Sequence, residues 1–218
     1  KSDILISLGI SDDWSFEEDF QKIKDVIIFA YDGSVNNKIL LKKIFYYIFR
    51  FKFKRGINAV KTFYSFYSFF KKKNNTFINK FVGLDGVNKS RGHISLANIL
   101  NNNQEKNLFL KIDIEGSEYR ILSTLLLMQK NICGLVLEFH DSDLHLEIIN
   151  NFVKNFNLKL VHIHANNFSG IRTDNNIPIV LELTFSRYSE LLDHTILPHE
   201  LDMPNDKEVN DIELTLDN

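Results

Sequence analysis

One stretch of the chain decides its fold class: residues 109–119 read Phe-Leu-Lys-Ile-Asp-Ile-Glu-Gly-Ser-Glu-Tyr. An apolar strand runs into two carboxylates, Asp113 and Glu115, which are followed by a glycine and a helix start. Alternation along the strand would put both carboxylates on one face. Charged groups at the mouth of a buried strand are costly unless a ligand, a metal ion or a proton uses them. We therefore expect a strand–turn–helix unit with a functional site at the carboxyl end of its strand.

Outward from this stretch, apolar runs and helical periodicities alternate along the chain. Strands are predicted near 3–9, 26–31, 81–85, 108–113, 134–139, 158–164 and 178–185, and helices near 15–24, 38–50, 58–70, 95–102, 117–130 and 143–156. Such alternation implies crossover connections and a mostly parallel sheet covered on both faces. No helical repeat separates the last two strands, which predicts an antiparallel hairpin. The expected fold class is α/β: a Rossmann-like, seven-stranded, mostly parallel sheet with an antiparallel C-terminal hairpin.

Length and composition are typical of one globular domain spanning residues 1–218. Apolar residues make up 44% of the chain and charged residues 25%, which excludes a disordered or fibrous class. The single cysteine, Cys133, excludes an internal disulfide. The sequence shows neither a secretory signal nor an apolar stretch of bilayer length, so a cytoplasmic location is expected.

Residues 34–80 form a basic, aromatic insertion after the second strand. They contain twelve Lys or Arg residues, thirteen Phe or Tyr residues and no acid. The pattern predicts two helices split at Lys54-Arg55-Gly56, and the aromatic residues from Phe63 to Phe70 recur at helical spacing. We favour a helical lid over the site or a docking surface for an acidic glycan, and in neither case is a nucleic acid partner expected. The alternative is that these residues lie on an anionic membrane or stack on nucleic acid. The tail at about 187–218 is acidic instead.

The first strand ends in a turn suited to a nucleotide-like ligand. Gly9 lets the backbone approach a ligand, and Ser11 and Asp12 follow it. The turn has one glycine, and its helix begins with acidic residues at 17–19, which would repel a phosphate. Asp32, at the end of the second strand, is placed to accept hydrogen bonds from ribose hydroxyls, or else is an ordinary turn residue. These features favour a cationic ligand without phosphate.

Two later strands bring further polar side chains to the same edge of the sheet. Glu138 and His140 lie close to the end of the strand at 134–139, and His140 is a candidate general base. Alternatively, His140 could hold a divalent cation together with Asp113 and Glu138. Beyond the next strand, substrate contacts are predicted for His164, Asn166 and Asn167, although loop capping explains these residues equally well.

Four segments together resemble the FkbM family of methyltransferases that depend on S-adenosylmethionine (SAM). The strongest match is residues 110–118, and residues 93–100, 135–140 and 7–17 match in the family's order. The resemblance implies SAM as cofactor, with the methionine end at Gly9 to Asp12, the ribose at Asp32, the adenine at Asp85 or Ser95, and Asp113 also in contact.

The resemblance further implies O-methylation of a hydroxyl on a sugar, a polysaccharide or a small natural product. Asp113, Glu115 and His140 would be the catalytic residues. The acceptor would therefore be a small molecule or a glycan. The alternative is a noncatalytic relative that acts as an interaction module through its basic aromatic insertion.

Overall fold

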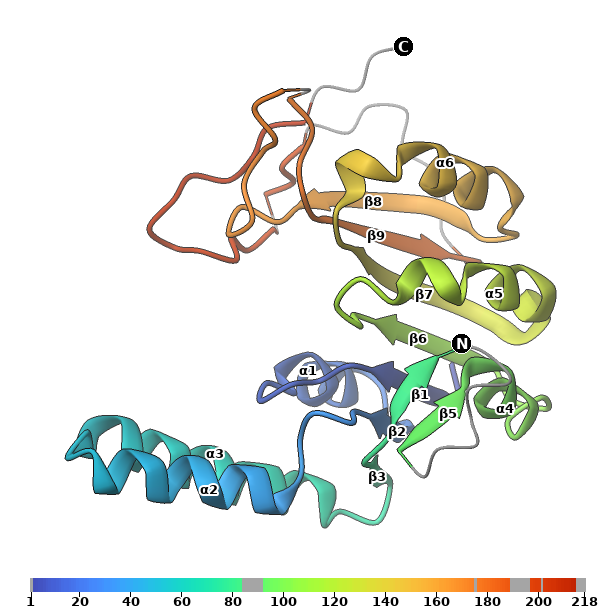
Figure 1. Cartoon of the computed structure of the whole chain (residues 1–218). Coiled ribbons are helices and arrows are strands. Elements are labelled where there is room, and N and C mark those ends of the chain that lie inside the picture. Colours follow the sequence, from blue (N-terminus) through green and yellow to red (C-terminus); the bar gives the residue numbers. More distant parts are fainter. Residues whose placement is uncertain (1, 84–91, 175, 189–196, 201, 215–218) are drawn as a thin grey trace.

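The computed structural model describes residues 2–83, 92–174, 176–188, 197–200 and 202–214. Its main sheet has seven strands in the order β3-β2-β1-β6-β7-β9-β8 (Figure 1). The strands are β1 (Ile4–Leu8), β2 (Ile27–Tyr31), β3 (Asn75–Ile78), β6 (Leu108–Ile112), β7 (Ile132–Phe139), β8 (Lys159–Ala165) and β9 (Leu181–Ser186). The pairs from β3 to β7 are parallel, whereas β9 runs antiparallel to both β7 and β8. The expected parallel sheet with a terminal antiparallel hairpin is confirmed.

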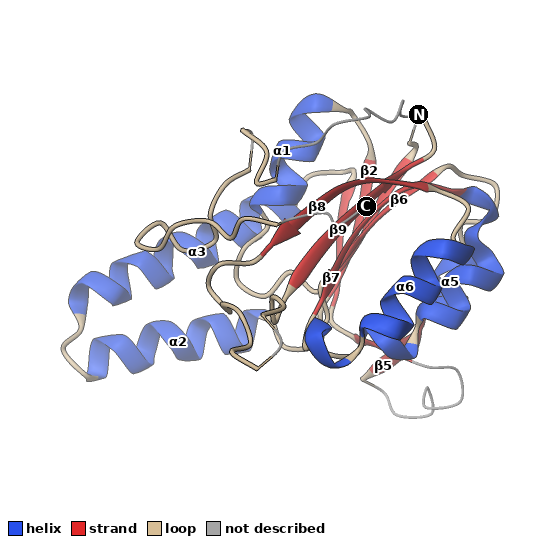
Figure 2. Cartoon of the chain, turned by 90° about the horizontal axis from the view of Figure 1, so that it is seen from above, coloured by secondary structure: helices blue, strands red, loops and turns tan. Residues whose placement is uncertain are grey.

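Helices cover both faces of this sheet. They are α1 (Ser15–Ile23), α2 (Asn37–Phe49), α3 (Phe53–Phe70), α4 (Leu96–Asn101), α5 (Leu122–Met128) and α6 (Leu146–Asn155). Figure 2 shows α5 and α6 on one face and α1, α2 and α3 on the other. Since all five residues of β1 are buried, the first strand lies between two apolar layers, as a central parallel strand should.

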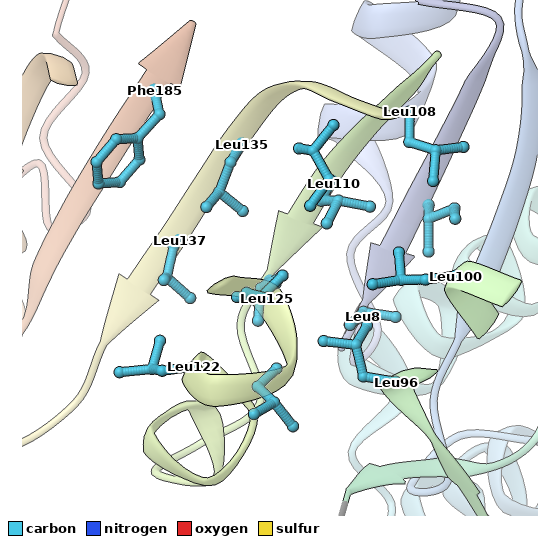
Figure 3. Close-up of a cluster of buried hydrophobic side chains, with 14 of the residues drawn as sticks. Leu8, Leu96, Leu100, Leu108, Leu110, Leu122, Leu125, Leu135, Leu137 and Phe185 are labelled. Carbon is cyan, nitrogen blue, oxygen red and sulfur yellow. The ribbon is translucent and has the colours of Figure 1, made fainter. Parts of the chain in front are cut away.

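Each face of the sheet has its own apolar core. On the α4–α5–α6 face, Leu8, Leu110 and Leu135 pack beneath Leu96 of α4 and Leu125 of α5 (Figure 3). Close packing of branched apolar side chains explains why these short helices remain attached to the sheet. The opposite face is more aromatic, and its buried members include Trp14, Phe66 and Phe69.

The third strand of the main sheet is not the one predicted. Residues 81–83 form β4 (Phe81–Gly83), which pairs with β5 (His93–Ser95) in a separate two-stranded sheet. The edge of the main sheet is instead β3, which lies inside the predicted insertion. Because β3 begins with the buried polar residue Asn75, a search for apolar runs does not detect this strand. That side chain is satisfied by Gln21, at 2.7 Å, and by the Phe69 carbonyl, at 3.1 Å.

The two helices of the insertion form a hairpin that extends away from the sheet (Figure 1). The predicted split at Lys54-Arg55-Gly56 is wrong, because the chain breaks at residues 50–52 and α3 begins at Phe53. The reversal is made by Phe51, which has a φ of 55°. Asn36 caps the start of α2 by accepting a hydrogen bond from the Ile39 amide at 3.0 Å.

Among the described residues, no helix combines the length and the apolar character needed to cross a bilayer.

Candidate active site

A cleft of about 320 Å³ opens at the carboxyl ends of β1, β2 and β6. Ligands of open α/β sheets bind at this edge. The described lining combines acidic, basic, aromatic and small residues: Gly9, Ser11, Tyr31, Asp32, Gly33, Ser34, Lys80, Phe81, Val82, Gly83, His93, Asp113, Ile114, Glu115, Ser117 and Arg120.

Gly9 allows the turn after β1 to pack directly against the backbone of the turn after β6. It has a φ of +80°, and a Cβ built on it would lie 1.7 Å from the carbonyl oxygen of Asp113. The Gly9 amide donates to the Tyr31 carbonyl at 2.9 Å, and the Asp113 amide donates to the Leu8 carbonyl at 2.9 Å. A side chain at this position would force the two turns apart, so the glycine is required for packing of backbone on backbone.

Asp32 holds the neighbouring turn together. Its Oδ2 accepts from the amides of Ile10, at 3.0 Å, and Ser11, at 2.8 Å, while its Oδ1 accepts from the amide and hydroxyl of Ser34, both at 2.6 Å. Burial alone would raise its pKa, but these hydrogen bonds outweigh burial and hold the pKa below its usual value. Because the carboxylate already accepts four hydrogen bonds, a ribose hydroxyl would have to replace the Ser34 hydroxyl.

Asp113 carries an unused acceptor inside the cleft. Its Oδ2 lies 3.4 Å from Nζ of Lys111, which also donates to the Gly9 carbonyl at 2.6 Å. Within the described residues, its Oδ1 is buried and has no hydrogen-bond partner. A buried carboxylate oxygen of this kind calls for a donor, which a ligand can supply.

Asp113 and Glu115 both line the cleft, but strand alternation does not put them there. β6 ends at Ile112, and Glu115 has a φ of 52° in the turn that follows. A left-handed residue turns the chain back, which brings the Glu115 side chain toward His140. The predicted proximity is therefore confirmed, while the predicted geometry is wrong.

His140 lies among three carboxylates. Its Nδ1 is 3.0 Å from Oε1 of Glu118, and its Nε2 is 3.2 Å from Oε1 of Glu138 and 3.4 Å from Oε2 of Glu115. Hydrogen bonds to Glu118 and then Glu138 raise the pKa of His140 to about 10. The ring is therefore an imidazolium at neutral pH. A protonated ring cannot accept a proton, so these surroundings do not suit the general-base role predicted for His140.

Glu118 and Glu138 respond differently to the same imidazolium. Burial favours the neutral form of Glu118, but the hydrogen bonds from the ring and from the amide of His140 outweigh it and lower the pKa. For Glu138 burial prevails, so its pKa is raised. Glu118 is thus a fixed anion, while Glu138 binds a proton more readily than an ordinary glutamate.

Among the described residues, one set of side chains could hold a divalent cation. Asp113, Glu115 and His140 each offer one ligand atom, and these atoms lie within 4.8 Å of one another. The predicted set contained Glu138 in place of Glu115. An imidazole must lose its proton before it can bind a metal ion, and the surrounding carboxylates oppose that loss.

Two predicted cofactor contacts, Ser95 and Asp12, do not line the described cleft. Ser95 is buried, and its hydroxyl caps α4 by accepting from the Asn98 amide at 3.2 Å. Asp12 forms an ion pair with Lys43 of α2. Asp85 lies outside the described residues.

The predicted substrate residues lie against the acidic tail. His164 Nε2 is 3.3 Å from Oδ1 of Asp211, and the Asn167 amide group donates to two tail carbonyls, those of Asp206 and Val209. Asn166 caps its own loop by accepting from the Phe168 amide at 3.0 Å. Loop capping, the structural alternative, thus explains Asn166, whereas His164 and Asn167 contact the tail. None of the three residues lines the described cleft.

The helical insertion does not cover the cleft. No residue of 37–70 is among the described lining residues. The hairpin is instead anchored beside β3, where Phe66 packs against Trp14 and Phe77 at ring-centroid distances of 5.4 and 5.0 Å. The lid interpretation is therefore wrong for this structure.

Two residues that sequence reasoning left without a role matter here. Glu118 is fully buried and fixes the His140 ring, and Lys111 joins the β1 turn to Asp113. Both belong to the stretch 109–119. A charged residue at a core position of that stretch was the available signal, since buried charges need partners.

Solved structures of two methyltransferases are similar to this chain at low sequence identity. Among solved structures, a precorrin-6y C5,15-methyltransferase from Geobacter metallireducens is 12% identical, with a TM-score of 0.44 over 86% of this chain and 82% of that one. An rRNA methylase from Streptococcus thermophilus is 9% identical, with a TM-score of 0.42 over 85% and 87%. No curated protein matched the chain.

The family comparison is more direct. The model of the methyltransferase FkbM domain matches residues 52–160, which is half of the chain. The match includes β6, β7 and the stretch that carries Asp113, Glu118 and His140. The chain belongs to the FkbM methyltransferase domain family.

Proposed function

We propose that the protein is a SAM-dependent O-methyltransferase that modifies a hydroxyl group on a sugar, a polysaccharide or a small natural product. The observation that carries the proposal is the buried Oδ1 of Asp113, which has no hydrogen-bond partner among the described residues and lies in a cleft at the carboxyl edge of the sheet. Membership of the FkbM family supports the methyl-transfer chemistry.

The cleft residues suit SAM. The donor carries positive charge on its ammonium and sulfonium groups and no phosphate, so Asp113 and Glu115 complement its charge. Tyr31 and Phe81 line the cleft and offer aromatic rings for contact with the adenine. When bound, SAM supplies a methyl carbon that the acceptor oxygen attacks as the carbon–sulfur bond breaks.

The chain's own residues would orient the acceptor and receive its proton. In this proposal, Asp113 accepts the hydroxyl proton at Oδ1. Glu138, whose pKa is raised by burial, is the second candidate acceptor. His140 is a positioning residue, because a protonated ring that contacts Glu115, Glu118 and Glu138 holds these carboxylates in place. Positioning then supplies most of the rate enhancement.

Calorimetric titration with SAM, combined with a methyl-transfer assay, tests the proposal. We expect the wild type to bind SAM and to add a methyl group to a hydroxylated acceptor from a panel of sugars, detected by mass spectrometry. Asp113→Asn should keep the fold, measured by circular dichroism, and lose transfer. Asp141→Asn is a matched control, because Asp141 is more exposed and does not line the cleft.

Two outcomes would contradict the proposal. If the folded wild type does not bind SAM, a noncatalytic interaction module becomes the better interpretation. If Asp113→Asn transfers methyl groups at the wild-type rate, Asp113 is not the proton acceptor.

A further inference from the structure

The tip of the α2–α3 hairpin presents three phenylalanines to solvent. Phe49 and Phe51 are each 80% exposed and Phe53 is 59% exposed. The rings of Phe51 and Phe53 contact each other at a centroid distance of 6.1 Å. Single exposed apolar residues are ordinary on protein surfaces, but three neighbouring phenylalanines at the end of a projecting element are not.

The apolar surface continues from the tip along both helices. Ile48 of α2 and Ile57 and Val60 of α3 are each about half exposed, at 46%, 58% and 48%. Together with Phe53 they line a shallow cavity of about 420 Å³ beside the tip. The hairpin therefore exposes a continuous apolar patch, which marks an interaction surface.

The same hairpin carries charge of one sign. Residues 37–70 contain eight Lys or Arg residues and no acid. Among the described residues, only one of these eight cations forms an ion pair: Lys43, in the middle of α2, pairs with Asp12. Four of the cations, Arg50, Lys52, Lys54 and Arg55, alternate with the exposed phenylalanines of the tip. A complementary partner therefore offers negative charge to the cations and an apolar region to the phenylalanines.

A phospholipid surface fits this combination better than the other partners. A second copy of the hairpin would bring eight more cations against the first eight, and like charges repel. A nucleic acid could stack on the three phenylalanine rings, but it would leave the exposed aliphatic side chains of Ile48, Ile57 and Val60 without an apolar partner. At a membrane interface, apolar side chains enter the acyl region, while lysines and arginines reach back to the headgroups.

We propose that the α2–α3 hairpin docks on the surface of an anionic phospholipid bilayer. Phe49, Phe51 and Phe53 enter the acyl boundary, and the cations around them contact the headgroups. The hairpin lies on the bilayer and does not cross it. Because no cleft residue comes from 37–70 and the hairpin points away from the sheet (Figure 1), docking leaves the cleft accessible.

Vesicle binding measures this docking. The intact protein is mixed with vesicles of phosphatidylglycerol and phosphatidylcholine, or of phosphatidylcholine alone, and the bound fraction is measured by flotation. We expect binding to the anionic vesicles, with at least about a tenfold loss of affinity when Phe49, Phe51 and Phe53 are all changed to serine. Lys52→Gln should weaken binding by about fivefold, and added salt should weaken it further.

A matched control uses exposed apolar residues elsewhere on the molecule. Ile23, Leu127 and Leu144 are 88%, 86% and 68% exposed and lie outside the hairpin. A triple serine variant at these positions removes comparable apolar surface and should bind anionic vesicles like the wild type. In a separate variant, Phe51→Trp, we expect the fluorescence to shift to shorter wavelength with vesicles, because Trp14, the native tryptophan, is already buried.

Three outcomes would overturn the proposal. The first is a folded wild type that does not bind anionic vesicles, and the second is a tip variant that binds them as the wild type does. The third is a lipid-independent dimer that forms through the tip and is lost in the tip variant, which would assign the patch to self-association. None of these outcomes bears on SAM binding, so the two proposals fail separately.

Discussion

The ring nitrogen Nδ1 of His140 lies 3.0 Å from Oε1 of Glu118, a side chain with no exposure to solvent. The same oxygen accepts a hydrogen bond from the backbone amide of His140 at 2.7 Å. One buried carboxylate on the α5 side of the turn therefore fixes both the ring and the backbone at the end of β7. Two further carboxylates, those of Glu115 and Glu138, also contact the His140 ring of this pair.

Changing Glu118→Gln should loosen this arrangement. We expect the pKa of His140 to fall from about 10 toward its usual 6.5, because the largest contribution that raises it is removed. Titration of the His140 ring protons by NMR measures the shift. Glu147→Gln, at an exposed position, is the matched control and should leave that pKa in place. If the pKa of His140 is unchanged in Glu118→Gln, then Glu138 and Glu115 alone are sufficient to keep it raised.

The same variant should lose stability over a defined pH range. A raised pKa of His140 stabilises the fold fully below pH 6.5, and this contribution disappears as the pH rises to about 10. The lowered pKa of Glu118 adds stability above its usual value of 4.5. We expect Glu118→Gln to lose about 2 kcal/mol in urea denaturation between pH 4.5 and pH 6.5, and progressively less as the pH rises to about 10. A deficit that grew at alkaline pH would contradict this account.

Gly9→Ala should destabilise the fold more than Gly116→Ala. Both glycines have positive φ, +80° and +85°, so both variants incur the left-handed strain of about 1 kcal/mol. Only the Cβ at Gly9 would collide with backbone, whereas nothing lies within 4 Å of one at Gly116. We expect a total loss of at least about 3 kcal/mol for Gly9→Ala in chemical denaturation. Equal losses in the two variants would show that the turns can separate freely.

Docking of the acidic tail should weaken at alkaline pH. His164 contacts Glu182 and Asp211, and these partners raise its pKa to about 9, with Glu182 contributing most. The stabilisation is complete below pH 6.5 and is lost as the pH rises through about 9. Hydrogen exchange of residues 202–214, corrected for the intrinsic pH dependence, should therefore be faster at pH 10 than at pH 7 in the wild type. His164→Gln should show the fast exchange at both values.

A chelator should leave methyl transfer unchanged at neutral pH. Asp113, Glu115 and His140 are close enough to share a cation, but His140 holds a proton that a metal ion would have to displace. Activity measured with and without EDTA, followed by added Mg²⁺ or Mn²⁺, tests the expectation. Loss of activity with EDTA and recovery with one metal would assign these residues to a metal site.

Much of the fold could be predicted from sequence because most strands are apolar runs. The mostly parallel sheet and its terminal hairpin followed from the alternation, and β6 and β7 lie within a residue or two of their predicted ranges. The exceptions have physical causes. β3 begins with a buried asparagine whose partners, Gln21 and the Phe69 carbonyl, are remote in sequence. The break at Phe51 depends on a left-handed residue that carries no sequence signal.

The candidate site was predictable in position but not in detail. Asp32, Asp113 and Glu115 were expected at one edge and line one cleft. The protonation of His140 was not predictable, because it depends on three carboxylates that converge on one ring from the segment after β6 and from β7. A residue's pKa follows from its neighbours in space, whereas a sequence pattern reports its neighbours along the chain.

The contacts between the acidic tail and β8 bear on aggregation. β8 is the last strand of the sheet, and an uncovered edge strand offers its backbone groups to any strand of another molecule. Tail residues Asp202 and Asp211 contact His162 and His164 of this strand. Charged groups held against an edge strand disfavour the approach of a second sheet. The acidic tail is therefore expected to disfavour pairing of β8 with an edge strand of a second molecule.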